Sequence, residues 1–166
     1  DSGINPGDIA EADIIAIEKQ GGQSCVQVFF FRAGQNLGNK AYFPRHERDQ
    51  AEPEILAAFI GQFYENRPVP REIFVNHKLA DAALIGEALS TRMGHNVKIL
   101  RPQRGDKMNL MRHAEQNARE ALARQVSESA SQRKLLNGVA KAFGLESAPK
   151  RIEVFDNSHL QGTNQL

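Results

Sequence analysis

The stretch CVQVFFFRAGQNLGNKAYF, residues 25–43, opens with seven residues of which six are apolar. Its β-branched and aromatic side chains favour a strand. Successive side chains of a strand point to opposite faces, and only Gln27 is polar within residues 25–31, so neither face is polar. A strand that is apolar on both faces must be covered on both sides, which predicts helices against each face of its sheet.

The chain on either side of residues 25–31 predicts two partner strands. Residues 33–38 carry two glycines and predict a hairpin with a loose turn, followed by a strand that ends before Pro44. Upstream, residues 13–18 (DIIAIE) read as a short strand that turns back through residues 20–23. The first third is therefore predicted to be a three-strand meander.

Helical and strand patterns alternate through the rest of the chain. The helices are predicted over 54–64 and 81–93, and the strands over 72–75 and 97–100. Pro53 suits a first helical turn, and Gly94 is a stop signal. The second helix is predicted to turn four side chains inward: Leu84, Ile85, Ala88 and Leu89.

A long helix is predicted to start at Asp106. Its pattern weakens at residues 127–131, where we expect a kink, and Asn137-Gly138 predicts a break. A second apolar set follows the weak region and ends at Gly144; its members are Leu135, Leu136, Val139 and Phe143.

The element order βββαβαβα predicts a mixed five-stranded α/β sheet with helices on both faces, in the ribonuclease H-like order. An α/β sandwich with another strand order is the alternative. We expect residues 1–12 to be a leader or linker and 13–148 to form one domain, with a further strand over 151–155 after Pro149.

The composition is that of an ordinary soluble globular protein, with 40% apolar and 25% charged residues and a net charge of +1. The balanced charge means that any basic surface must be local. The single cysteine, Cys25, lies in the most apolar strand and is expected to be buried and inert, consistent with the cytoplasm. No apolar run approaches a membrane span, and the first residue is not Met, so we expect the chain to begin within a longer protein.

A nuclease of ribonuclease H type needs carboxylates from several elements to hold two divalent ions. Residues 14–17 in the first strand are wholly apolar, and Asp13 is expected at the strand edge. Glu18 and Glu72 lie at predicted strand ends, where an acid is more often solvated than metal-bound. The pattern therefore predicts a sheet without a nuclease centre. His46, His77, His95 and His113 show no metal-ligand spacing, which argues against zinc.

The densest basic loop runs from Arg101 to Lys107 and includes Arg104, and Arg112 extends it into the long helix. Basic side chains beside a helix amino terminus can hold a phosphate, so this is the candidate nucleic-acid contact. The alternative is a solvated loop in which Asp106 caps the helix. The tyrosines and phenylalanines follow core patterns and are expected to pack rather than stack on bases.

Residues 151–163, RIEVFDNSHLQGT, resemble the opening strand of the endonuclease domain in the UvrC family, a component of the bacterial UvrABC excinuclease. Three further stretches resemble the same family: VQVFFFRAGQNLGNKAYFP at 26–44, EILAAFIGQFY at 54–64 followed by PVPREI, and RPQRGDKMNLMRHAEQNARE at 101–120. The resemblance covers nearly the whole chain. It implies a cytoplasmic nucleotide-excision-repair protein that works with UvrA and UvrB and cuts damaged double-stranded DNA on both sides of a lesion.

In this family a ribonuclease H-like domain makes the 5′ cut with Mg²⁺ or Mn²⁺, and Asp156 matches its first catalytic acid and metal ligand. The resemblance implies that the other ligands lie beyond Leu166, so residues 149–166 are expected to be the first strand of a truncated endonuclease domain. We therefore expect a non-catalytic positioning module that holds no cofactor of its own. The alternatives are a working nuclease, in which Asp156 joins Glu153 or Asp13, and a purely structural spacer.

Overall fold

The computed structural model describes residues 10–145. Because an unpaired apolar strand seeks a partner, the strand predicted over 151–155 is also expected to lie against this domain or to pair with a neighbouring molecule. This strand, most of the expected leader and Asp156 lie outside the described residues.

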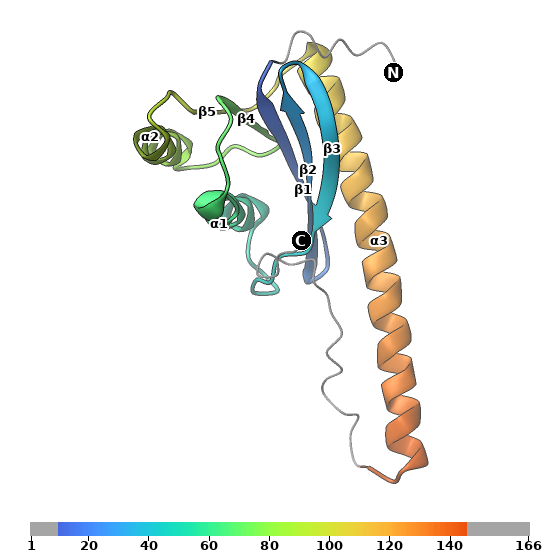
Figure 1. Cartoon of the computed structure of the whole chain (residues 1–166). Coiled ribbons are helices and arrows are strands. Elements are labelled where there is room, and N and C mark those ends of the chain that lie inside the picture. The colour runs from blue at the N-terminus through green and yellow to red at the C-terminus, as the bar shows by residue number, and fades with distance from the viewer. Residues whose placement is uncertain (1–9, 146–166) are drawn as a thin grey trace.

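The described residues form five strands in one sheet, with helices on both of its faces (Figure 1). The elements are β1 (Ala12–Gln20), β2 (Gln23–Arg32), β3 (Gln35–Tyr42), α1 (Glu52–Phe63), a short 3₁₀ helix η2 (Tyr64–Asn66), β4 (Glu72–Val75), α2 (Ala82–Met93), β5 (Lys98–Leu100) and α3 (Gly105–Ala142). The strand order is β3-β2-β1-β4-β5. Strands β1 to β3 pair antiparallel, and β1, β4 and β5 pair parallel, which confirms the predicted mixed sheet.

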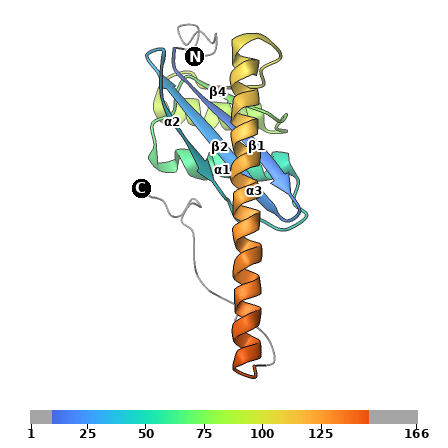
Figure 2. The ribbon, with the colours of Figure 1, turned by 90° about the vertical axis from the view of Figure 1, so that its right-hand side faces the viewer.

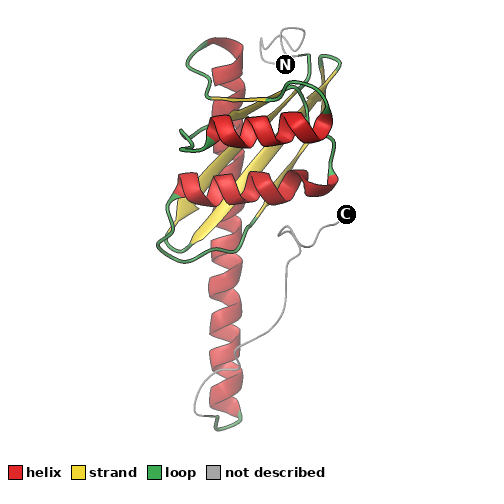
Figure 3. Cartoon of the chain, turned by 90° about the vertical axis from the view of Figure 1, so that its left-hand side faces the viewer, coloured by secondary structure: helices red, strands yellow, loops and turns green. Residues whose placement is uncertain are grey.

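Both faces of the sheet are buried, as the apolar pattern of residues 25–31 predicted. Helices α1 and α2 lie on one face (Figure 3), and α3 crosses the other. In β1, Ile15 and Ile17 pack on the side of α1, whereas Ile14 and Ala16 pack beneath α3. The central strands therefore contribute side chains to two separate hydrophobic clusters, one on each face of the sheet.

The turn between β2 and β3 is tight, contrary to the loose turn expected over residues 33–38. Only Ala33 and Gly34 separate the strands, and both have positive φ, 55° and 75°. The following residues already belong to β3, because a register shift between Phe30 and Phe31 absorbs the extra residue. Positive φ at both positions matches the twist of a two-residue hairpin.

Helix α2 turns a different face inward from the one predicted. Leu84 is 64% exposed and Ala88 is also exposed, whereas Ile85 and Leu89 do contact the core. Ile85, Leu89 and Met93 are spaced by one turn and share a face, while Leu84 is rotated from Ile85 by about 100°. The helix ends at Gly94 in the left-handed conformation, as predicted.

Helix α3 is one uninterrupted helix of 38 residues, so the predicted kink at 127–131 and break at Asn137-Gly138 are wrong (Figure 2). Serine, asparagine and glycine each weaken a helix by about 1 kcal/mol or less, and the packed first half of α3 tolerates that. The second half extends beyond the sheet. No helix within residues 10–145 has the length and apolar character needed to cross a membrane.

Most aromatic residues of the described chain pack in the core, as expected, but Phe143 at the end of α3 is 75% exposed. Tyr42, Phe59, Phe63 and Tyr64 form a cluster whose neighbouring ring centroids lie 5.0–5.4 Å apart. Cys25 is fully buried, and burial raises its pKa to about 12, which confirms a thiol inaccessible to solvent.

Candidate functional site

Acidic side chains from three elements gather where β1 ends. Glu18 lies in β1, Glu52 begins α1, and Glu115 lies on α3. Burial raises the pKa of Glu18, the Arg119 guanidinium lowers it, and the charges of Glu115 and Glu52 raise it further. We call this group, completed by Asn76 and His77 after β4, the β1-end cluster.

Each acid of the β1-end cluster has a partner within the chain. The Arg119 Nη1 atom lies 3.3 Å from the Glu18 carboxylate, and the Asn76 amide donates a hydrogen bond to Glu115 over 2.8 Å. The His77 Nε2 atom lies 3.9 Å from Glu52. The positive charge beside Glu18 is therefore that of Arg119, a side chain of α3.

Asn76 directly follows β4, and its side chain forms two more hydrogen bonds to the backbone of β1. Its Oδ1 accepts from the Ile17 backbone N–H at 3.0 Å, and its Nδ2 donates to the Ile17 carbonyl at 3.1 Å. A carboxylate at this position could accept but could not donate, so it would lose the bonds to the Ile17 carbonyl and to Glu115. The uncharged amide of Asn76 can both donate and accept, as its three hydrogen bonds at this position require.

The sequence interpretation of Glu18 as a solvated residue at a strand end is wrong. Glu18 lies inside β1, and its side chain is only 23% exposed. The alternation of side chains along β1 could have predicted this burial. Glu18 lies on the same face as Ala12, Ile14 and Ala16, and α3 covers that face.

The described residues do not match the ligand set of a two-ion nuclease. Within residues 10–145, no group of three or more His, Cys, Asp or Glu side chains is arranged to hold a metal ion. Two-ion cleavage uses several carboxylates that share the ions, whereas Glu18 is paired with Arg119 and Glu115 with Asn76.

Asp13 lies on the other face of β1, next to α1 rather than α3. It is fully buried; one carboxylate oxygen accepts from Arg32 Nη1 at 2.8 Å and the other accepts from the Tyr64 hydroxyl. Burial, and then the negative charge of Asp13, raises the pKa of Tyr64. Asp13 therefore belongs to a buried ion pair, away from Glu18.

The four predicted DNA-contact residues differ in exposure. Arg101 follows β5, Arg104 is the residue before α3, and Arg112 lies two turns into α3; all three are exposed. Lys107 is partly buried, with its ammonium 5.3 Å from the centre of the Phe74 ring. The structure thus presents the three arginines to solvent and turns Lys107 toward the sheet.

The amino terminus of α3 lacks the side-chain cap that the alternative interpretation expected. Arg104 is the capping residue, and no side chain caps the helix, so Asp106 does not have the capping role considered for it. In the described part of the chain, no carboxylate lies within ion-pair distance of Arg101, Arg104 or Arg112.

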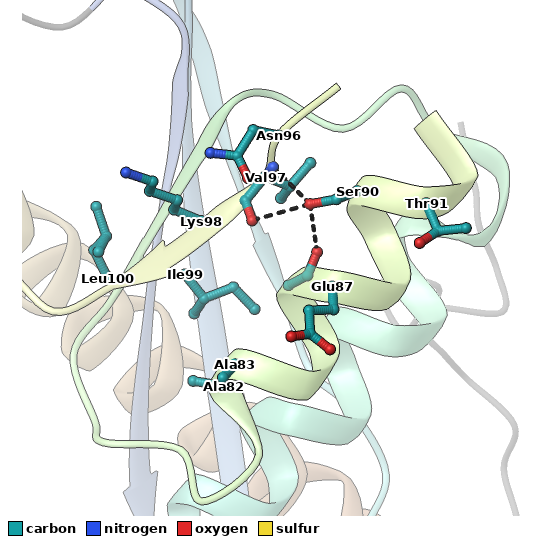
Figure 4. Close-up of a pocket in the computed structure, with 11 residues that line it drawn as sticks. Ala82, Ala83, Glu87, Ser90, Thr91, Asn96, Val97, Lys98, Ile99 and Leu100 are labelled. Carbon is teal, nitrogen blue, oxygen red and sulfur yellow. Dashed lines mark hydrogen bonds between the residues drawn. The ribbon is translucent and has the colours of Figure 1, made fainter. Parts of the chain in front are cut away.

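A separate pocket of about 530 Å³ lies between α2 and β5 (Figure 4). Small residues of α2 line one wall, and Ser90 ties the helix to β5 because its hydroxyl donates to Gly86 and accepts from the Val97 N–H. Glu87 and Lys98 are the charged residues of its lining. None of the predicted site residues lies in this pocket.

The strand order β3-β2-β1-β4-β5 and the helices on both faces agree with a ribonuclease H-like α/β domain. Residues 11–125 match the family model described as the UvrC ribonuclease H-like domain, and residues 140–166 match that of the UvrC RNase H endonuclease domain. The chain therefore belongs to the UvrC ribonuclease H-like domain family.

Curated relatives named UvrABC system protein C align with almost the whole chain. The protein of Maricaulis maris is 54% identical over 166 residues, covering 100% of this chain and 26% of its own length. That of Nitrobacter hamburgensis is 53% identical, covering 99% and 24%. That of Hyphomonas neptunium is 57% identical, covering 98% and 26%. The chain thus spans about a quarter of the length of these relatives.

Proposed function

We propose that this chain is a part of the nucleotide-excision-repair protein UvrC that positions DNA and neighbouring domains without cutting DNA itself. The β1-end cluster is the observation that carries this proposal. Glu18 is paired with Arg119, and Glu115 accepts a hydrogen bond from Asn76, so both acids already have partners within the chain. Cleavage of DNA then belongs to another part of the same protein.

The whole UvrC protein is proposed to cut damaged double-stranded DNA in the cytoplasm, together with UvrA and UvrB. The names of the relatives and the match of residues 140–166 to the endonuclease family support this role. Mg²⁺ or Mn²⁺ would be held by that endonuclease domain, with Asp156 as one ligand. The domain over 13–148 would hold no metal of its own.

The DNA contact is proposed at the loop from Arg101 to Arg104 and at Arg112. Three exposed guanidinium groups and an uncapped helix amino terminus favour phosphate oxygens, which carry no sequence information. Lys107 is expected to contribute less, because its stem packs against Phe74. Binding at this surface would position the duplex in any sequence context.

Cleavage is tested with the 166-residue chain and damaged duplex DNA in Mg²⁺ or Mn²⁺. We expect no incision, and no difference between the unsubstituted chain and Asp156→Ala. Metal-dependent incision that Asp156→Ala abolishes would support the alternative of a working nuclease. Incision that Glu18→Gln abolishes would place a nuclease centre at the β1-end cluster and overturn the proposal.

DNA binding is tested by fluorescence anisotropy at several salt concentrations. Arg101→Ala, Arg104→Ala and Arg112→Ala should each weaken binding and lower the slope of log Kd against log salt by about one per lost phosphate contact. The matched control is Arg133→Ala, an exposed arginine near the far end of α3. Equal effects at Arg104 and Arg133, or no binding at all, would favour the purely structural spacer.

A further inference from the structure

The apolar side chains of α3 divide into a buried set and an exposed set along the helix. Six of the seven buried residues of α3 lie in the first half against the sheet: Leu110, Met111, Ala114, Ala118, Ala121 and Leu122; the seventh, Ala140, lies in the second half. In the second half, Leu135 is 69% exposed, Val139 is 38% exposed and Phe143, at the end of the helix, is 75% exposed. We call these three residues the distal ridge.

The distal ridge is one face of the helix, because its residues recur every fourth position. The exposed polar residues Lys134, Asn137 and Lys141 lie on the opposite side of the same turns. A helix with one apolar side is usually packed against a partner along that side. The ridge therefore has the form of a contact surface.

The ridge lies well away from the sheet. Val126 is the last residue of α3 that packs against the core clusters. The stretch of α3 from residue 127 to residue 142 extends roughly 24 Å at a rise of about 1.5 Å per residue (Figure 2). No element of the described sheet can cover a ridge at that distance.

The two family matches point to what covers it. The match to the ribonuclease H-like domain ends at residue 125, and the match to the endonuclease domain begins at residue 140, within α3 itself. The ridge, at residues 135–143, thus overlaps the start of the endonuclease match. A domain attached this closely has a high effective concentration at the ridge, so a modest apolar contact suffices to hold it.

We propose that the distal ridge is the docking surface for the part of the endonuclease domain that follows α3, so that α3 acts as a rigid arm between two ribonuclease H-like domains. This inference rests on the positioning role proposed above and names the neighbour that is positioned. Docking of Leu135, Val139 and Phe143 would hold the endonuclease domain at a fixed distance and angle from the Arg101–Arg112 surface.

The test uses the full-length UvrC protein that contains this stretch. The ridge variant carries Leu135→Gln, Val139→Gln and Phe143→Gln, and the matched control carries Lys134→Gln, Asn137→Gln and Lys141→Gln on the opposite side. Hydrogen–deuterium exchange over residues 127–142 is the first readout. We expect exchange to speed up roughly tenfold in the ridge variant and to change by less than about twofold in the control.

Incision of damaged DNA in the presence of UvrA and UvrB is the second readout. The ridge variant should lose 5′ incision, or shift its position, while its 3′ incision stays as in the control. A milder triple alanine variant should give the same pattern with a smaller loss, which separates docking from failure to fold.

Unchanged exchange and unchanged incision in the ridge variant would overturn the docking proposal. So would protection of the ridge that depends on protein concentration and coincides with dimer formation in light scattering, because a second copy would then be the occupant. Neither result depends on the Arg104→Ala and Arg133→Ala binding comparison, so failure of docking remains distinguishable from failure of the positioning role.

Discussion

The Arg119 guanidinium lies 3.3 Å from the Glu18 carboxylate, although the two residues are 101 positions apart in the chain. Arg119 also donates to Gln116 over 2.9 Å, and this second bond holds the guanidinium along α3. The pair joins α3 to β1 at the place where three acids gather. A positive side chain there counters the mutual repulsion of Glu18, Glu52 and Glu115.

Replacing Arg119 should raise the pKa of Glu18 further. Arg119 lowers that pKa, whereas burial and the two neighbouring acids raise it, so Arg119→Met leaves only raising influences. Carboxyl-carbon NMR titration measures the change directly. Arg119→Lys keeps the charge and should give a smaller rise; equal pKa values in Arg119→Met and the unsubstituted chain would contradict the pairing.

Glu18 should make the stability of the domain depend on pH. Its raised pKa means that, above the ordinary value of 4.5, the folded chain holds a proton that the unfolded chain has lost. The free energy of unfolding contributed by Glu18 is therefore fully present below pH 4.5 and is lost as the pH rises through the raised pKa.

Glu18→Gln removes this titration. Its free energy of unfolding, measured in urea between about pH 4 and pH 7, should fall less with rising pH than that of the unsubstituted chain. Glu128→Gln, an exposed change on α3, is the control for the loss of one carboxylate. Parallel profiles for all three chains would show that Glu18 titrates alike in the folded and unfolded states.

Arg32→Met should destabilise the domain strongly, by about 3 kcal/mol, because it leaves the Asp13 carboxylate buried and without its cation. Asp13→Asn added to Arg32→Met should recover part of that loss, since an uncharged amide can still accept from Tyr64. Urea unfolding measures both changes. A double variant no more stable than Arg32→Met would show that Arg32 acts through packing rather than charge.

Ala33→Asn should stabilise the β2–β3 hairpin. Ala33 has φ 55°, a left-handed conformation that costs an alanine about 1 kcal/mol and that asparagine adopts more readily. Followed by Gly34, the substitution creates the Asn-Gly pair that two-residue hairpins favour. Thermal unfolding should shift upward by a few degrees, whereas Ala33→Val should shift it downward because a β-branched side chain resists positive φ.

The candidate site was only partly predictable from the sequence. The basic loop around Arg104 could be proposed from the sequence because charge density and a helix start are local properties. The pairing of Glu18 with Arg119 was missed, because no residue near Glu18 in the sequence indicates a partner on α3. The burial of Asp13 was missed for the same reason: Tyr64 reaches it from the end of α1.

The elements, their order and the burial of β2 on both faces follow from the amino-acid sequence alone. The alternation of apolar side chains, the helix start at Pro53 and the helix end at Gly94 are all set by residues that are close together in the sequence. Three-dimensional packing was needed to show which face of α2 turns inward, that α3 continues through Asn137 and Gly138, and that the cation beside Glu18 is Arg119. These outcomes depend on distances between elements that are remote in the chain, and those distances are set by how the sheet and helices pack.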